Sequence, residues 1–385
     1  MSSDALPVAK KGFLNKDFLP ADKQDPPICK EELSTFFPFF RHLKRGTYFK
    51  VNRFIKFFLY GWIRVVLMLV PLIIGGILSK ILLFPFRKRT KLNEETGYSD
   101  LPRWVVRINQ GLCRFVGWGL TAGGRVKVKV TGKRDKNVKL FVANHTSFMD
   151  PVILVRQFGC SCIVNHNLKK APFLSSLLLG MESIFVDRLD PESRSLAGRI
   201  IKARTKCDIT GPSVMIFPEG TTSNNCGLMR FNRGAFHNEN VFHPMVFSYD
   251  WKESNPAFDV GSFWPMVLAM LTSRPVTCNI HILPQMQATD PTETAVKVQK
   301  LMSDFLDVPI FDLTIKEKVI YEKFLDKKIT WNELLEKFEE KNLSLIQNDR
   351  SFEEMYQEQL ILQNESIFNK RTHPSIAEFA AEHYK

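Results

Sequence analysis

The amino-acid sequence predicts an α/β fold in which a mixed, largely parallel sheet is flanked by helices. Between residues 126 and 283, short apolar runs of strand length alternate with stretches of helical length, a pattern typical of a parallel sheet. A 23-residue apolar run, residues 57–79, precedes this region and predicts a membrane-embedded helix or hairpin. From residue 315 onward Glu, Lys, Leu and Gln dominate, with apolar residues at helical spacing, which predicts a C-terminal helical appendage.

The composition supports a membrane-associated protein. The chain has 385 residues and a net charge of +13. Between residues 41 and 136 it has 21 Lys and Arg against four acidic residues, whereas from residue 315 it has 11 basic against 14 acidic residues. Basic charge around the most apolar part of a chain favours an anionic membrane surface. No recognised nucleic-acid module is present, so we expect no nucleic-acid partner. The seven cysteines are scattered without a CxxC pair, so we expect reduced thiols and no metal site.

The N-terminal part divides into a disordered polar lead, residues 1–40, and a membrane-associated basic and apolar segment, residues 41–120. No apolar core lies close to Met1, so no cleavable signal peptide is predicted. As a helix, residues 57–79 would be about 34 Å long, enough to cross a hydrocarbon core of about 30 Å. Basic clusters flank the run on both sides, which disfavours a single span. A hairpin bent near Pro71 is slightly preferred, and both structures remain open.

Two shorter segments also have membrane character. Residues 101–120 are amphipathic, with three arginines interleaved with Trp104, Phe115 and Trp118, which predicts either an interfacial helix or an ordinary domain helix. Residues 263–271, FWPMVLAML, are too short to cross a bilayer. This second segment either packs on the core or dips into lipid.

The α/β domain is expected over residues 121–312, and the appendage over residues 313–385. RVKVKV alternates strictly and predicts an edge strand. The other expected elements follow in chain order: strands at 138–143, 160–164, 183–186, 213–217, 241–248 and 276–283, and helices at 171–180 and 191–207.

A histidine and a carboxylate lie five residues apart where the first buried strand ends, in NHTSFMD. We expect a strand, a tight turn and a helix start here, with Thr146 or Ser147 as N-cap and Asp150 in the first turn. Across such a turn the Asp150 carboxylate reaches one imidazole nitrogen of His145 and leaves the other free as a base. Taken alone, such a pattern is more often an ordinary capped turn than a catalytic pair.

Two further motifs follow: IFVDR at residues 184–188 and IFPEGTT at residues 216–222. With NHTSFMD, in this order, the set resembles the glycerolipid acyltransferase family over about residues 126–284. The resemblance implies an acyltransferase domain within residues 121–312 that transfers an acyl group from acyl-CoA to a glycerol-phosphate or lysophospholipid hydroxyl. It also implies that His145 is the general base, that Asp150 orients it, and that no cofactor other than the co-substrate acyl-CoA is needed.

The resemblance further implies a set of substrate-binding residues. Arg188 would bind substrate phosphate, since its planar guanidinium matches phosphate oxygens; a salt bridge to a neighbouring acid is the alternative. The other implied residues are Glu219, Gly220 and Thr221 for the acceptor, and Lys169 and Lys170 for coenzyme A phosphates. An ordinary strand-ending turn and a solvated face are the respective alternatives. The family's fourth motif is poorly kept, because residues 241–249 read VFHPMVFSY, without a closing proline.

Within the family, FVDRLDPESRS, EGTTSNN and MRFNRGAF most resemble the lysophosphatidylcholine and lysophosphatidylethanolamine acyltransferases, whereas MLTSRPVTCNIHIL is equally similar to the glycerol-3-phosphate enzymes. We therefore expect a lysophospholipid acceptor, with glycerol 3-phosphate or lysophosphatidate as the alternative. An inactive membrane scaffold is the competing function of another class. The expected location is the endoplasmic reticulum membrane or a related endomembrane, with the catalytic domain in the cytosol.

Overall fold

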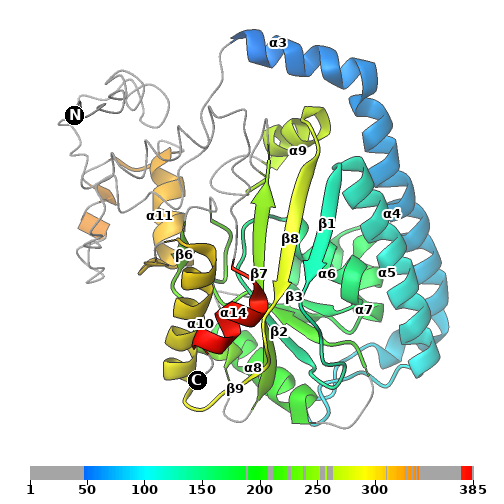
Figure 1. Ribbon diagram of the computed structural model, residues 1–385. Coiled ribbons are helices and arrows are strands. Elements are labelled where there is room, and N and C mark those ends of the chain that lie inside the picture. Colours follow the sequence, from blue (N-terminus) through cyan, green and yellow to red (C-terminus); the bar gives the residue numbers. More distant parts are fainter. Residues whose placement is uncertain are drawn as a thin grey trace, which may run out of the picture.

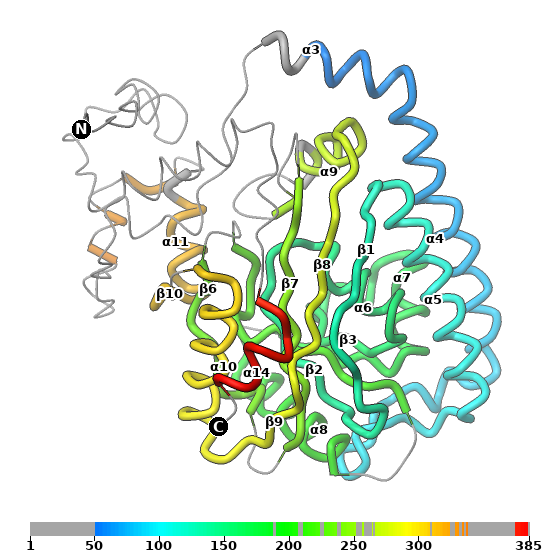
Figure 2. The backbone as a smooth tube through the Cα atoms, viewed as in Figure 1, coloured from blue at the N-terminus to red at the C-terminus, as the bar shows by residue number. Residues whose placement is uncertain are grey.

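The computed structural model describes most of the chain between residue 47 and residue 337, and a last helix. The described residues are 47–187, 190–206, 211–223, 227–236, 240–251, 256–257, 263–308, 310–325, 328–330, 333–334, 336–337 and 374–383. The predicted polar lead, residues 1–40, lies outside them. Figure 2 traces the backbone from the blue N-terminal helices to the red C-terminal one.

The N-terminal part is helical. Its elements are α3 (Thr47–Lys56), the π-helical turn η2 (Phe57–Gly61), α4 (Trp62–Leu83), the 3₁₀ turn η3 (Phe84–Arg89) and α5 (Arg103–Gly123). The stretch Val51–Arg89 is apolar and long enough to cross a membrane, judged by its length and composition alone. Most of its large apolar side chains are exposed.

The predicted bend at Pro71 is wrong, because α4 continues through this proline without a break. A proline in a helix leaves the carbonyl four residues earlier without its N–H partner, here the carbonyl of Leu67. Gly119 of α5 lies against this site, and a Cβ there would meet Pro71 and lie 2.8 Å from the Leu67 oxygen. Close contact with α5 thus covers the defect, and α4 and α5 lie side by side (Figure 1).

The remaining elements belong to the α/β domain and to the C-terminal part of the chain. The strands are β1 (Val126–Thr131), β2 (Leu140–Ala143), β3 (Ser161–Asn165), β4 (Ile184–Val186), β5 (Val214–Ile216), β6 (Leu228–Met229), β7 (Val241–Asp250), β8 (Val276–Ile282), β9 (Met286–Gln287) and β10 (Ile310–Phe311). The helices and helical turns are α6 (Met149–Phe158), η4 (His166–Lys170), α7 (Leu174–Gly180), α8 (Pro191–Lys206), η5 (Arg233–Ala235), α9 (Phe263–Thr272), α10 (Pro291–Leu306), α11 (Ile315–Leu325) and α14 (Ile376–His383).

The main sheet has the strand order β1-β8-β7-β2-β5-β3-β4, with β9 added to β7. Neighbouring strands are parallel except where β7 meets β8 and β9. The predicted mixed, largely parallel sheet is therefore confirmed, and β1 is the predicted edge strand.

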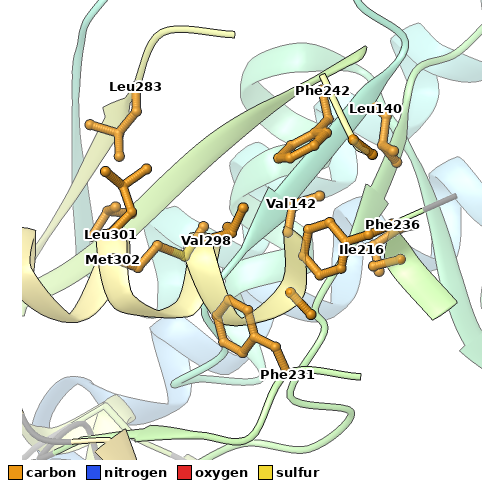
Figure 3. Packing of buried hydrophobic residues seen from close by; sticks show 14 of the residues in the cluster. Leu140, Val142, Ile216, Phe231, Phe236, Phe242, Leu283, Val298, Leu301 and Met302 are labelled. Carbon is orange, nitrogen blue, oxygen red and sulfur yellow. The ribbon is translucent and has the colours of Figure 1, made fainter. Parts of the chain in front are cut away.

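Both faces of the sheet are covered. Leu140 and Val142 of β2 point into a core shared with α8 and α10 (Figure 3). Phe141 and Ala143 point the other way, into a core shared with α6. Burial on both faces explains why β2 reads as a continuous apolar run. The last helix contributes Phe379 to the first core, so α14 packs against the domain.

Candidate active site

The site is built where β2 ends and the chain turns into α6. Asn144, the first residue after the strand, pairs with the backbone of Phe247 in β7: its Nδ2 donates to the carbonyl (3.0 Å) and its Oδ1 accepts from the N–H (2.7 Å). This pair of hydrogen bonds fixes the end of β2 against the neighbouring strand. His145 is the next residue, so the position of its backbone is fixed as well.

His145 and Asp150 are in contact. The His145 Nδ1 lies 2.9 Å from Asp150 Oδ2, and the imidazole stacks on Phe217, with ring centroids 4.1 Å apart. Because an ionised carboxylate only accepts hydrogen bonds, Nδ1 carries the proton and Nε2 keeps a lone pair. The His145 side chain is 14% exposed. The pair can therefore take a proton from a hydroxyl.

Asp150 is fully buried and accepts further hydrogen bonds. Its Oδ2 accepts the backbone N–H groups of Thr146 (2.7 Å) and Ser147 (2.8 Å), and its Oδ1 accepts the hydroxyl of Tyr249 in β7. Burial, followed by the neighbouring Asp150, raises the pKa of Tyr249 well above its usual value, so this hydroxyl keeps its proton.

Asp150 accepts the backbone N–H groups of Thr146 and Ser147 in this turn. The predicted N-cap is wrong, since α6 begins at Met149 with Phe148 as its N-cap residue and no side-chain cap. Ser147 is buried and its Oγ accepts from the N–H of Met149.

Glu219 links the histidine to a second loop. Its Oε1 accepts the backbone N–H of His145 at 2.6 Å, and its Oε2 accepts that of Met229 in β6 at 3.1 Å. The side chain is buried, and burial raises the pKa of Glu219 to about 8, although both N–H groups oppose the rise. In this geometry Glu219 holds the His145 backbone in place.

Gly220 and Thr221 continue the motif. Gly220 has φ +71°, a left-handed conformation that side chains disfavour. Thr221 is mostly buried, and its Oγ1 lies 3.3 Å from Nζ of Lys318. The motif therefore forms a tight turn beside the histidine loop.

Sequence reasoning missed three site residues: Asn144, Tyr249 and Lys318. Asn144 is adjacent to the motif histidine, and its position at a strand end was the available signal. Lys318 of α11 is buried and donates to the carbonyl of Thr222 at 2.8 Å. Nothing in the local sequence distinguishes Lys318 from its exposed neighbour Lys316.

The remaining predicted residues lie elsewhere. Arg188 is outside the described residues. Lys169 is exposed, with Nζ 5.2 Å from the ring centre of Phe185, and lines a surface cavity of about 660 Å³ together with Asp187 and Arg199. Lys170 is exposed in the same 3₁₀ turn. Within the part of the chain that the structure describes, no three His, Cys, Asp or Glu side chains form a group that could hold a metal ion.

Comparison with known proteins finds similarity over much of the α/β domain. Residues 126–248 match the family model named Acyltransferase. The lysophosphatidylcholine acyltransferase 2 of Rattus norvegicus is 26% identical over 224 residues, which is 56% of this chain and 41% of that protein. The lysophospholipid acyltransferase LPCAT4 of Xenopus tropicalis is 32% identical over 184 residues, which is 44% of this chain and 34% of that protein.

Glycerol-3-phosphate acyltransferases are similar as well. Glycerol-3-phosphate acyltransferase 3 of Danio rerio is 30% identical over 203 residues, which is 50% of this chain and 43% of that protein. The chain thus spans about half the length of the curated relatives it matches, or less. The crystal structure of the 1-acyl-sn-glycerophosphate (LPA) acyltransferase PlsC from Thermotoga maritima aligns with 63% of this chain and 96% of its own, with 16% identity and a TM-score of 0.39. Residues 126–248 thus match the Acyltransferase family model, and the chain is similar in sequence to lysophospholipid and glycerol-3-phosphate acyltransferases.

Proposed function

We propose that the protein moves a fatty acyl group from acyl-CoA to the free hydroxyl of a lysophospholipid. The observation that carries this proposal is the contact of His145 with the buried Asp150, in a domain related to lysophospholipid acyltransferases. His145 is the general base, and Asp150 orients it. No cofactor besides the co-substrate acyl-CoA is required.

The step needs one base. As the acceptor oxygen attacks the thioester carbonyl, Nε2 of His145 takes the hydroxyl proton. The tetrahedral intermediate then collapses, the carbon–sulfur bond breaks, and the imidazolium returns the proton to the departing coenzyme A thiolate. Asp150 stabilises the imidazolium and keeps the Nδ1–H tautomer.

The other motif residues bind or position in this proposal. Gly220 and Thr221 bind the acceptor, and Arg188 binds its phosphate. Lys169 and Lys170 bind coenzyme A phosphates; both are exposed, and Lys169 lines the surface cavity. Glu219 was predicted to bind substrate; with both oxygens accepting backbone N–H groups, we propose that it acts chiefly by positioning His145.

The proposed location is the endoplasmic reticulum membrane or a related endomembrane, with the domain on the cytosolic side. The buried residues of α4 recur along its length, from Arg64 through Pro71 and Gly75 to Leu83. The helix therefore packs against α5 and α7 over its whole length. This packing supports an α4 that enters one leaflet beside the domain, since a crossing helix would draw α5, with exposed Arg107 and Arg114, into the hydrocarbon core.

Glycerol 3-phosphate or lysophosphatidate is the second candidate acceptor. It is supported by the similarity to glycerol-3-phosphate acyltransferase 3, at 30% identity. The chemistry at His145 is the same for all these acceptors, because each offers a hydroxyl to the thioester.

The test is acyl transfer by membranes that contain the wild type, His145→Ala or the control His383→Ala, in which a histidine on α14 is removed. Labelled oleoyl-CoA is offered with glycerol 3-phosphate, lysophosphatidate or a lysophospholipid of each headgroup. We expect product with a lysophospholipid, and a loss of about 10²–10⁴-fold in His145→Ala only. Product that does not depend on His145, or no product with any acceptor from well-expressed protein, would overturn the proposal and favour an inactive scaffold.

A further inference from the structure

Arg64 lies within the long apolar helix α4, yet the residue is only 8% exposed. Its Nη1 donates to the carbonyl of Leu271 (2.5 Å) and to that of Ser273 (3.3 Å). Its guanidinium also lies over the ring of Tyr60, 4.4 Å from the centroid. The charge therefore faces the protein, toward the end of α9.

Tyr60 contributes to the same contact, because its hydroxyl donates to the carbonyl of Thr272 at 3.2 Å. Three consecutive carbonyls at the C-terminal end of α9 thus accept hydrogen bonds from η2 and α4. The last carbonyls of a helix have no partner within it and form the negative end of its dipole. Arg64 and Tyr60 therefore cap α9 and attach it to the N-terminal helices.

The α9 helix itself is apolar, with the sequence FWPMVLAMLT and no charged residue. It connects β7 to β8 and lies beside the junction of α3 and α4 (Figure 1). Ala269 and Leu271 are buried, whereas Trp264 is 75% and Leu268 39% exposed. The two exposed side chains are four residues apart, so they share one face of the helix.

The neighbouring surface of α3, η2 and the start of α4 is also apolar and exposed. Phe54, Phe58, Leu59 and Trp62 are all more than half exposed, and Arg53 and Lys56 lie among them. Aromatic residues beside Lys and Arg are typical of the membrane–water interface. The exposed face of α9 is therefore fixed next to a surface with the composition of a membrane anchor.

We propose that α9 is a second lipid-contacting element, which inserts Trp264 and Leu268 into the same leaflet of the bilayer as α4 and is held there by the Arg64–Tyr60 cap. The inference rests on the proposed membrane attachment through α4. A bilayer suits this face because the adjoining α4 surface is hydrophobic over the length of a membrane-spanning helix. With ten residues, α9 is about 15 Å long, half the hydrocarbon thickness, so it stays in one leaflet.

The first test places a nitroxide label, one position at a time, in the full chain on vesicles of phosphatidylcholine and phosphatidylglycerol. Trp264→Cys and Leu268→Cys probe α9, Ile73→Cys on α4 is the lipid reference, and Val296→Cys on α10 is the solvent reference. The reactive native cysteines are changed to serine. The readout is the relaxation of the label by oxygen, which concentrates in lipid, against a water-soluble nickel chelate.

We expect labels at 264 and 268 to resemble the label at 73, with high oxygen and low nickel accessibility. Labels at 264 and 268 that resemble the label at 296, while the label at 73 lies in lipid, would overturn the inference and leave the α4 anchor intact. If the label at 73 is also in water, the membrane attachment on which the inference rests fails instead.

The second test concerns the cap. Arg64→Met should increase deuterium uptake in the peptide that covers residues 263–273 by about tenfold while leaving β2 and α6 unchanged, and Arg64→Lys should have a smaller effect. Lys80→Met, which removes an exposed charge from the same helix, is the matched control. Uptake in Arg64→Met equal to that of the control would show that Arg64 does not hold α9.

Discussion

The carboxylate of Asp150 is fully buried and accepts four hydrogen bonds. The donors are the His145 imidazole, the N–H groups of Thr146 and Ser147, and the Tyr249 hydroxyl. A buried charge is costly unless such donors replace water. The arrangement fixes the rotamer of Asp150, and through it the orientation of the imidazole. Activity should therefore depend on the donors as well as on the proposed catalytic pair.

Tyr249→Phe tests this dependence. The substitution removes a hydrogen bond to a charged group, which contributes about 1.5–3 kcal/mol, and leaves Oδ1 of Asp150 without that donor. We expect kcat to fall roughly tenfold with little change in KM, and the apparent Tm to decrease. Steady-state kinetics and thermal unfolding in detergent would measure both. A Tyr249→Phe variant with wild-type kcat would show that the hydroxyl does not help to orient the pair.

Glu219 makes the stability of the site pH-dependent. Its pKa is about 8 in the folded protein, raised from 4.5 by burial. Between these values the folded state holds a proton that the unfolded state has released, so stability falls as pH rises from about 5 to 8. We expect the apparent Tm of the wild type to fall more over this range than that of Glu219→Gln, in which the group cannot ionise. Equal pH dependence of the two proteins would contradict the raised pKa.

Helix α11 brings a charge from the C-terminal part into the site. Lys318 donates to the Thr222 carbonyl and lies near both Thr221 and Thr222 hydroxyls. It thereby holds the turn that follows Glu219. We expect Lys318→Met to lower kcat/KM about tenfold, the effect of losing about one hydrogen bond to a charged group. Lys316→Met, on the exposed side of α11, should leave kcat/KM unchanged; equal effects of the two substitutions would refute a specific role for Lys318.

The pairing of α4 with α5 depends on residues without side chains. A Cβ at Gly119 would meet Pro71, whereas a Cβ at Gly111 on the same helix meets nothing within 4 Å. Gly119→Ala should therefore destabilise the protein by about 1–3 kcal/mol. Gly111→Ala should be neutral or stabilising by up to about 1 kcal/mol, because alanine is the better helix former. In detergent, the apparent Tm of Gly119→Ala should lie below that of the wild type, and that of Gly111→Ala should equal or exceed it. A decrease in Tm for Gly111→Ala as large as that for Gly119→Ala would contradict the role of Gly119 in helix packing.

Local pattern predicted much of this architecture. The alternation of RVKVKV predicted β1, and the apolar run before Asn144 predicted β2, because both signals depend only on which faces of a strand are buried. The contact of His145 with Asp150 was also predictable, since both lie on one short turn. Tyr249 and Lys318 were not, because they reach the site from 99 and 97 residues away, through packing that no local pattern encodes. The unbroken course of α4 through Pro71 likewise depends on Gly119, a residue of another helix.

The proposed attachment of the protein to the membrane depends on the position of α4 along the domain. If α4 enters a single leaflet, the basic clusters before and after it face the same aqueous side. Cysteines introduced at Lys56 and Arg89 should then react equally with a membrane-impermeant maleimide added outside sealed microsomes. A protected cysteine at one position and a reactive one at the other, with both reactive after detergent is added, would show a transmembrane span.

The pairing of β1 with β8 has a consequence for the order of events during synthesis. In the described sheet β1 pairs with β8 alone, and the paired residues Thr131 and His281 are 150 positions apart. At about 5–20 residues per second, the ribosome needs roughly 8–30 s to add the missing partner. Helix α4 is synthesised before this interval, whereas the sheet cannot close until the interval has passed. If α4 attaches to the bilayer as proposed, the nascent chain has time to reach the bilayer first, and the domain then folds on a chain that is already attached.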